Sequence, residues 1–302
     1  SPAASDAGGI SLAPTLLDLQ INGYGGVDFQ RDDHLTEEQL LSAARLMRRD
    51  GWGRFFFTLI TDEWPKLMAR VRRAKAIRDA NPELRAALAG WHIEGPFLSP
   101  ETGFKGAHNP AVMRDATEAD IRELRAVTGT DPVLLTLAPE RNGSIEAIRL
   151  AVSLGIVVSL GHTNASADTM RLAVAAGATG FTHLGNGIPQ QLDRHDNILW
   201  RVFETPGLTV SLIPDRIHVS PTLFRLMHRV LKRESIYYTT DAMAAAGAPP
   251  GHYKIGQLEL EVGADQIVRL PGKPNFAGSA LRPIDGIFRA GQMLGRPWQE
   301  VW

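Results

Sequence analysis

The stretch Arg54–Ile93, RFFFTLITDEWPKLMARVRRAKAIRDANPELRAALAGWHI, decides the fold because it holds one complete strand–helix–strand unit. Arg54–Leu59 and Leu88–Ile93 are short apolar runs that favour strands, and Glu63–Ala80 between them has a helical pattern. This order of elements predicts a parallel βαβ unit. The number of such units along the chain then decides the fold class.

The same alternation continues on both sides of this unit. Six further runs are predicted as strands: Thr15–Ile21, Val133–Leu137, Ile156–Leu160, Gly180–Thr182, Leu208–Ile213 and Ile236–Thr239. Helical patterns lie at Glu37–Arg49, Ile145–Leu154 and Thr222–Lys232. Eight strands separated by helices predict an α/β protein of the (β/α)8 TIM-type barrel class. A doubly wound open sheet is the alternative that the same alternation allows.

The pattern changes after the eighth predicted strand. Lys254–Leu270 alternates between apolar and polar residues around a Gly-Ala-Asp turn, which predicts a β-hairpin inserted at about residues 254–270. A last helical pattern covers Pro283–Met293. Because no repeat, low-complexity tract or linker divides the chain, residues 1–302 are expected to form a single barrel domain.

Composition excludes several classes of protein and site. The 302 residues include 32 Lys and Arg against 33 Asp and Glu, and no basic run indicates a nucleic-acid or membrane partner. With no cysteine, a metal ion must be held by His, Asp, Glu or backbone oxygen. No apolar stretch reaches the roughly 18–20 residues of a membrane span, and the first residues lack a signal pattern. A cytoplasmic location is therefore expected.

Polar residues follow the predicted strands at one end. In a TIM barrel the functional groups lie at the carboxyl ends of the strands. The polar residues found there are Gln20, Asn22, His92, Glu94, His162, His183, Asn186, Asp215, Arg216, His218 and Asp241.

Each of these residues also has an ordinary structural interpretation. A single buried His is more often structural than a ligand, Glu94 could be a salt-bridged loop carboxylate, and Asp241 could cap a helix. Taken together, however, Glu94, His162 and His183 have the composition of a catalytic zinc site with an open fourth position. Asp241 would place a base beside the metal-bound water, as hydrolysis requires.

The remaining histidines are interpreted differently. His92 shares a strand face with Glu94, but a structural role is favoured for it. Surface or structural positions are expected for His34, His195, His228 and His252, whose surroundings are charged or turn-like.

Seven segments, in order, resemble the N-acetylglucosamine-6-phosphate deacetylase family of the amidohydrolase superfamily. They span about Leu12–Pro283, nearly the whole chain. The segments are Leu17–Gly23 with Gly25–Gly26, His92–Phe97, Lys105–Pro110, Gly161–Asn164, Thr182–Asn186, Thr239–Ala242 and Ala277–Ala280. The pair His-x-Glu-Gly-Pro and Lys-Gly-x-His-Asn-Pro is the specific part of this resemblance.

The resemblance implies a role for each matched catalytic position. Glu94, His162 and His183 would be the metal ligands, and Asp241 the general acid and base. His108 would polarise the acetamide carbonyl. The implied reaction converts N-acetylglucosamine 6-phosphate to glucosamine 6-phosphate and acetate.

The resemblance also implies a phosphate site and a homodimer. Asn186, the Gly187 backbone and His218 would bind the phosphate of the amino sugar. Arg194 fits the family's phosphate-binding arginine, which reaches across a dimer interface. An exposed loop cation is the alternative interpretation of Arg194, because the sequence around it is polar.

Two departures from the family pattern matter. Many amidohydrolases carry His-x-His on strand one, where this chain has Gln20-Ile21-Asn22. Because amides are poor zinc ligands, one divalent metal ion, most simply Zn²⁺, is expected. The small β-domain that family members build from both chain ends is expected to be largely missing here.

Two other functions stay open from the sequence. Another amidohydrolase could act on a related N-acyl amino sugar or cyclic amide, although the fourth strand region, Val133–Glu140, offers no lysine for carbamylation. A catalytically silent barrel used as a binding protein is the second alternative, and the presence of every expected ligand argues against it.

Overall fold

The computed structural model describes residues 4–5, 11–31, 35–272 and 276–302. Eight strands form one curved sheet in the order β12-β11-β10-β9-β8-β7-β6-β3, and every neighbouring pair is parallel. Because the strands follow chain order without a reversal, this is the predicted barrel and not a doubly wound sheet. The strands are β3 (Leu16–Ile21), β6 (Trp52–Ile60), β7 (Leu88–Glu94), β8 (Val133–Leu137), β9 (Val157–Leu160), β10 (Gly180–Phe181), β11 (Thr209–Leu212) and β12 (Ile236–Tyr238).

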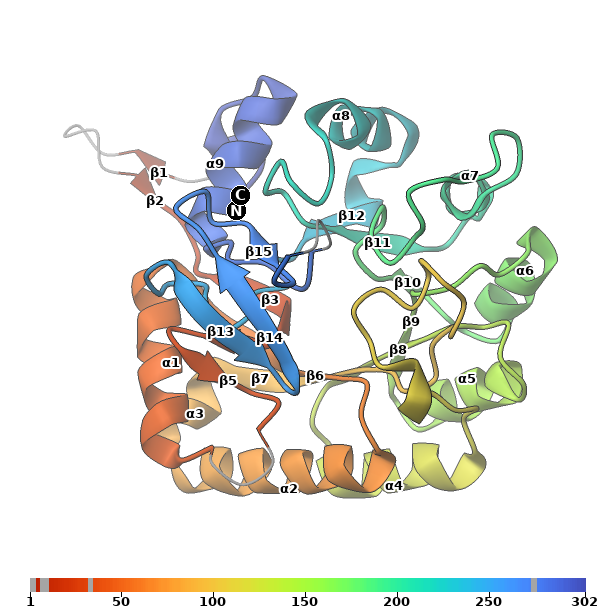
Figure 1. Cartoon of the computed structure of the whole chain (residues 1–302), viewed down its shortest axis with the longest axis horizontal. Helices are drawn as coiled ribbons and strands as arrows, with labels where there is room; N and C mark the ends of the chain where they lie inside the picture. Colours follow the sequence, from red (N-terminus) through yellow and green to blue (C-terminus); the bar gives the residue numbers. More distant parts are fainter. Residues whose placement is uncertain (1–3, 6–10, 32–34, 273–275) are drawn as a thin grey trace.

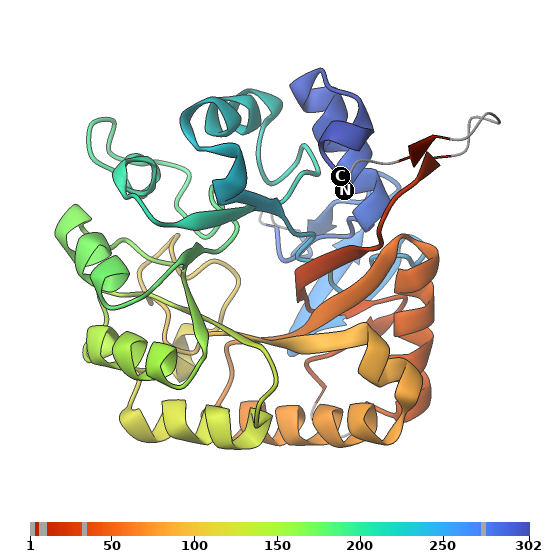
Figure 2. The same cartoon turned by 180° about the vertical axis from the view of Figure 1, so that it is seen from behind.

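Helices surround this sheet (Figures 1 and 2). They are α1 (Glu37–Arg49), α2 (Trp64–Ala80), α3 (Pro82–Ala87), α4 (Glu118–Thr128), α5 (Ser144–Ser153), α6 (Ala167–Ala175), α7 (Ile198–Glu204), α8 (Pro221–Val230) and α9 (Pro283–Leu294). The five helices predicted from the sequence lie within two residues of their predicted bounds; α3, α4, α6 and α7 were not predicted. Thr36 and Thr117 begin α1 and α4 with capping boxes, which satisfy the first backbone amides.

The barrel closes between β3 and β12 through a buried side chain. Among the described residues no strand ladder joins these two strands. Instead, Asp18 of β3, which is 2% exposed, accepts hydrogen bonds from the Thr239 hydroxyl and from both the amide and the hydroxyl of Thr240. The isolated parallel bridge between Ile21 and Ala242 continues the closure toward the carboxyl ends. The Asp18 carboxylate therefore takes the place of part of a backbone hydrogen-bond ladder between β3 and β12.

A three-stranded antiparallel sheet follows β12 and lies over one face of the barrel (Figures 1 and 2). It consists of β13 (Gly251–Ile255), β14 (Leu258–Val262) and β15 (Val268–Arg269). The hairpin predicted at residues 254–270 is present as β14 and β15, but β13 was missed. The apolar residues of this sheet pack with Met243–Ala245, Ala277 and Ala280 in a cluster separate from the main barrel core.

Short elements complete the described part of the chain. Two hairpins pair β1 (Ala4–Ser5) with β2 (Ser11–Leu12) and β4 (Gly23–Tyr24) with β5 (Val27–Asp28). Single 3-10 turns lie at Pro110–Val112, Arg233–Ser235 and Trp298–Glu300.

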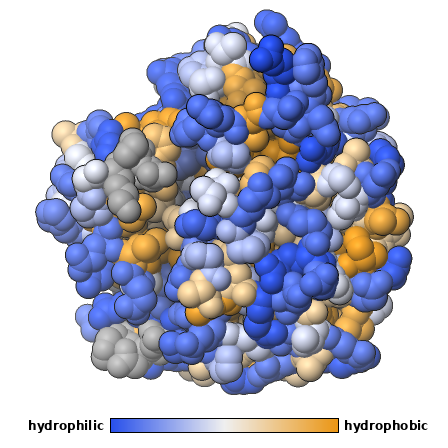
Figure 3. Space-filling model, turned by 45° about the vertical axis from the view of Figure 1, so that its right-hand side comes forward, coloured by the Kyte–Doolittle hydropathy of each residue, from blue (hydrophilic) through white to orange (hydrophobic). Residues whose placement is uncertain are grey.

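The outer surface is mixed in polarity. On the face shown in Figure 3, hydrophobic residues form small separate groups among hydrophilic ones. Within the described ranges, no helix has both the length and the apolar character needed to cross a membrane.

We expect Asp18→Ala to lower the free energy of unfolding by about 3 kcal/mol, because it leaves buried donors of Thr239 and Thr240 without an acceptor. Urea unfolding at neutral pH measures this change. Asp168→Ala is the control, since this exposed α6 carboxylate pairs with the exposed Arg171 and its loss should cost no more than about 0.5 kcal/mol. Equal losses in the two variants would contradict the role given to Asp18.

Candidate metal and catalytic site

A cavity of about 950 Å³ opens at the carboxyl ends of the barrel strands. Its walls include five residues predicted to act in catalysis: Glu94, His108, His162, His183 and Asp241. They come from the ends of β7, β9, β10 and β12 and from the loop after β7. Strands far apart in the sequence therefore place their polar ends around one space, as the barrel topology requires.

Three of these side chains converge on a common point. The Nε2 atom of His183 lies 2.8 Å from Oε1 of Glu94, and Nε2 of His162 lies 3.4 Å from the same oxygen. All three ligand atoms lie within 4.8 Å of one another, and all three residues are buried. Ligand atoms of a tetrahedral zinc site are about 3.3 Å apart. Glu94, His162 and His183 therefore fit a divalent metal ion.

His162 is oriented by its second ring nitrogen and by its neighbours. Its Nδ1 lies 2.8 Å from the Phe104 carbonyl, so Nδ1 carries the proton and Nε2 keeps its lone pair for a metal. Two loops enclose the ring. A Cβ atom added to Gly106 would lie 2.7 Å from Cε1 of His162, and one added to Gly187 would lie 2.7 Å from Nδ1. The ring fits because both neighbours lack a side chain.

The two amides of strand one orient the catalytic carboxylates. Gln20 donates from Nε2 to Oε2 of Glu94 at 3.1 Å, and Asn22 donates from Nδ2 to Oδ1 of Asp241 at 2.7 Å. The side chains of Gln20 and Asn22 are thus engaged in positioning Glu94 and Asp241.

Three functional residues have an unusual backbone. His162, His183 and Asp241 have φ angles of 50°, 33° and 51°, in the left-handed region that residues with a side chain rarely adopt. Each lies two or three residues after the last residue of a barrel strand. Such strain, of order 1 kcal/mol or more per residue, persists where the surroundings enforce it, and it turns these side chains into the cavity.

The two carboxyl groups of the cavity have opposite pKa shifts. Burial alone would raise the pKa of Glu94, but its contacts with the imidazoles of His162 and His183 hold that pKa well below its usual range. Burial, followed by the charge of Glu94, raises the pKa of Asp241 above its usual range. A divalent cation between the two carboxyl groups would lower the pKa of Asp241 and so oppose both causes that raise it. Glu94 is therefore suited to hold a cation, and Asp241 to exchange a proton.

His108 is held as a neutral imidazole with a defined tautomer. Burial, and then the nearby His162, lowers the pKa of His108 to about 3. The backbone N–H of Thr61 donates to Nδ1 at 3.4 Å, and the Thr61 hydroxyl lies 2.9 Å from the same atom. With Nδ1 accepting, the proton resides on Nε2. His108 can therefore donate a hydrogen bond without carrying charge, and sequence reasoning missed Thr61, the residue that sets this state.

The predicted phosphate-binding residues divide into two groups. Asn186, Gly187 and His218 line the cavity, and Nδ1 of His218 is held 2.5 Å from Oδ2 of Asp215. Arg194 is exposed and does not line the cavity of its own chain. Its role in phosphate binding stays a prediction.

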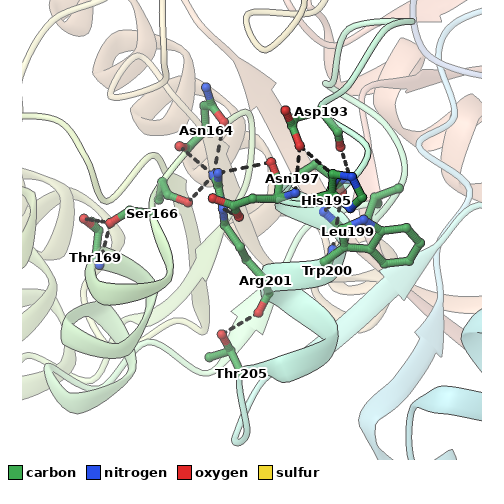
Figure 4. Close-up of polar contacts among 12 residues, drawn as sticks. Asn164, Ser166, Thr169, Asp193, His195, Asn197, Leu199, Trp200, Arg201 and Thr205 are labelled. Atoms are coloured by element: carbon green, nitrogen blue, oxygen red, sulfur yellow. Dashed lines mark hydrogen bonds and ion pairs between the residues drawn. The ribbon is translucent and has the colours of Figure 1, made fainter.

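The segment that carries Arg194 is held by local hydrogen bonds (Figure 4). Asp193 accepts from the amides of His195 and Asp196, and Asn197 caps the start of α7. The Trp200 indole donates to the Arg194 carbonyl at 3.3 Å. These hydrogen bonds fix the backbone of the loop, although the Arg194 side chain faces solvent.

Arg216, which the sequence places in the loop after strand seven, is directed away from the cavity. It is exposed, has a φ of 68°, and its guanidinium bonds to Gln292 of α9. The backbone carbonyl of its neighbour Asp215 accepts from Arg289 of the same helix at 3.2 Å.

Four of the remaining histidines, His92, His195, His228 and His252, lie outside the cavity wall. Nε2 of His92 lies 2.7 Å from the Thr136 hydroxyl in the barrel interior, and His228 packs beside Phe224 and Tyr238. His195 and His252 are exposed, and the prediction for His34 falls outside the described residues.

Comparison with known proteins gives a consistent set of relatives. No family model matches the chain. The chain is 34% identical over 295 residues to an N-acetylglucosamine-6-phosphate deacetylase of Bos taurus, covering 94% of this chain and 69% of the relative. It is 31% identical over 271 residues to an N-acetylgalactosamine-6-phosphate deacetylase of Escherichia coli O157:H7, covering 89% of this chain and 69% of the relative.

A solved structure agrees with these relatives. The N-acetyl-D-glucosamine-6-phosphate deacetylase of Mycobacterium smegmatis, in a mutant form bound to N-acetyl-D-glucosamine-6-phosphate, superposes with a TM-score of 0.84. Its sequence is 33% identical, and the match covers 95% of this chain and 73% of that one.

We expect Gly106→Ala to weaken zinc binding about tenfold or more, because the added Cβ displaces the His162 ring. Zinc affinity is measured by competition with a chromophoric chelator. Gly295→Ala is the matched control: Gly295 also has a positive φ, but a Cβ there would contact nothing within 4 Å. Both variants should lose about 1 kcal/mol of stability, and only Gly106→Ala should lose zinc. Unchanged zinc affinity in Gly106→Ala would refute the steric argument.

Proposed function

Because the chain belongs to the N-acetylglucosamine-6-phosphate deacetylase family, we propose that it hydrolyses the acetamide of N-acetylglucosamine 6-phosphate to acetate and glucosamine 6-phosphate. The observation that carries this proposal is the convergence of Glu94, His162 and His183 beside Asp241 in one cavity. Metal ligands next to a proton-exchanging carboxylate are what amide hydrolysis at neutral pH requires.

The proposed cofactor is one divalent metal ion per chain, with Zn²⁺ as the best match. Two imidazoles and one carboxylate are typical catalytic zinc ligands. The single-metal proposal is supported by Gln20 and Asn22, whose amides are already engaged with Glu94 and Asp241. When bound, the ion supplies water activation and polarisation of the acetyl carbonyl.

In the proposed mechanism, side chains of the cavity hold the substrate and move one proton. Asp241 accepts a proton from the attacking water and returns it to the leaving nitrogen. The side-chain amide of Asn22 holds the Asp241 carboxylate in place. His108 donates from Nε2 to the acyl oxygen as charge develops there. Asn186, the Gly187 backbone and His218 bind the sugar phosphate.

A homodimer is the proposed assembly. Its support is the exposed position of Arg194, outside the cavity of its own chain. In the family pattern this arginine serves the neighbouring subunit's phosphate site. The cytoplasmic location stays a prediction from the sequence.

A second candidate substrate is the epimer N-acetylgalactosamine 6-phosphate, because one relative of similar identity carries that activity in its name. The catalytic groups serve both sugars equally, so only the contacts to the sugar hydroxyls distinguish them. Another amidohydrolase activity or a silent barrel are the wider alternatives.

Acetate release from both phosphorylated sugars tests the proposed function and its metal. We expect turnover of N-acetylglucosamine 6-phosphate that chelation abolishes and zinc restores, with one metal ion per chain by elemental analysis. Faster release from the galactose epimer would change the assigned substrate. Absence of acetate from either sugar in zinc-loaded protein would refute the deacetylase proposal, and two ions per chain would refute the single-metal site.

We expect Asp241→Asn to bind zinc with parent affinity but to lose about 10²- to 10⁴-fold in kcat, because an amide cannot accept and return the proton. Steady-state acetate release and zinc analysis measure the two effects. Asp265→Asn, on the turn between β14 and β15 and paired with Arg269, is the control with parent activity. A kcat within a few-fold of the parent in Asp241→Asn would assign the proton transfer to another residue.

A further inference from the structure

We propose that Lys105 is a phosphate-specificity residue, which supplies from within the same chain the cation that a phosphorylated sugar needs. This proposal rests on the proposed function, whose substrate carries a phosphate group. Lys105 lines the catalytic cavity and is half-buried there. No contact was assigned to it from the sequence, although it begins the segment Lys105–Pro110.

The charges of the cavity wall point to Lys105. Glu94 and Asp241 contribute two negative charges, which one divalent metal ion would balance, so no positive charge remains for a further anion. Among the described residues that line the cavity, Lys105 is the only lysine or arginine. A phosphate ester carries a charge of about −1.5 to −2 near pH 7. Binding it in this cavity requires a further cation beside the phosphate.

The position of Lys105 brings it to the predicted phosphate subsite. Its loop packs against the loop that contains Gly187: a Cβ on Gly103 would lie 2.5 Å from Cβ of Pro189, and one on Gly106 would lie 3.9 Å from Cα of Gly187. Asn186 and Gly187, the predicted phosphate contacts, therefore face the segment from which the lysine extends.

The backbone of Lys105 is fixed while its ammonium is free to bind. Its amide donates to the Glu101 carbonyl at 3.0 Å, and its carbonyl accepts from the His108 amide at 3.1 Å. The Glu101 carboxylate is engaged with the Asn164 amide at 3.1 Å. Within the described chain, Lys105 makes no ion pair. A cation with a fixed base and no acidic partner is available for an anionic ligand.

The test compares Lys105→Met, Lys105→Arg and Lys232→Met as zinc-loaded proteins. The first readout is phosphate preference, the ratio of kcat/KM for N-acetylglucosamine 6-phosphate to that for N-acetylglucosamine. We expect Lys105→Met to lower this ratio about tenfold or more, since a charge-assisted contact is lost. Lys105→Arg should restore most of it. Lys232→Met, at an exposed lysine that does not line the cavity, should keep the parent ratio.

A second readout does not depend on turnover. Calorimetric titration with glucosamine 6-phosphate and with glucosamine should show weaker binding of the phosphorylated amine alone in Lys105→Met. Binding of that amine to the parent should also weaken more steeply with added salt than binding to the variant.

The outcomes separate this proposal from the proposed function. A Lys105→Met protein that keeps the parent ratio, or that loses activity toward both sugars by the same factor, overturns the assignment. If Lys105→Arg fails to restore the ratio, the lysine acts through the loop and the assignment also fails. If the parent binds glucosamine 6-phosphate through Lys105 but releases no acetate, Lys105 stands as a phosphate residue and the deacetylase proposal fails.

Discussion

The position of Asp241, the proposed catalytic base, depends on how the barrel closes between its first and last strands. The carboxylate of Asp18 spans this junction and accepts hydrogen bonds from Thr239 and Thr240. The next contact along the junction of β3 and β12 is a hydrogen bond from the backbone amide of Asn22 to the Ala242 carbonyl, at 2.7 Å. Beside it, the Asn22 side chain donates to Asp241. Closing the barrel thus fixes Asp241 opposite the ends of β7, β9 and β10, where the candidate metal ligands lie.

The cavity is organised by residues that do not themselves react. Gln20 orients Glu94, the Phe104 carbonyl orients His162, and Thr61 sets the tautomer of His108. His162, His183 and Asp241 also have left-handed backbones, and such strain persists only where the surrounding structure enforces it. The rest of the barrel maintains that strain and keeps the reacting groups in place before a substrate arrives.

The barrel and its principal polar residues could be predicted because both follow from local patterns. Alternating strands and helices define the topology, and that topology dictates that Glu94, His162 and His183 meet. The supporting contacts could not be predicted, since they join residues far apart in sequence: Thr61 meets His108, and Asn22 meets Asp241.

The same limit explains the differences between prediction and structure. The strand β13 was missed because it begins at Gly251, before the hairpin predicted at residues 254–270. It is defined by its pairing with β14. The direction of Arg216 depends on Gln292, in a helix 76 residues away. Nothing in the loop sequence reveals that partner.

The small sheet β13–β15 has a consequence for how such an enzyme can change over generations. It lies between the last barrel strand and the last helix, packs in an apolar cluster separate from the main barrel core, and contributes Ile255 to the cavity wall. All three candidate metal ligands precede it by more than 60 residues in the chain. Insertions and substitutions in this sheet can therefore reshape the entrance while the hydrolytic centre is inherited intact. The range of substrates that enter the cavity and the chemistry of the hydrolytic centre can thus change independently of each other.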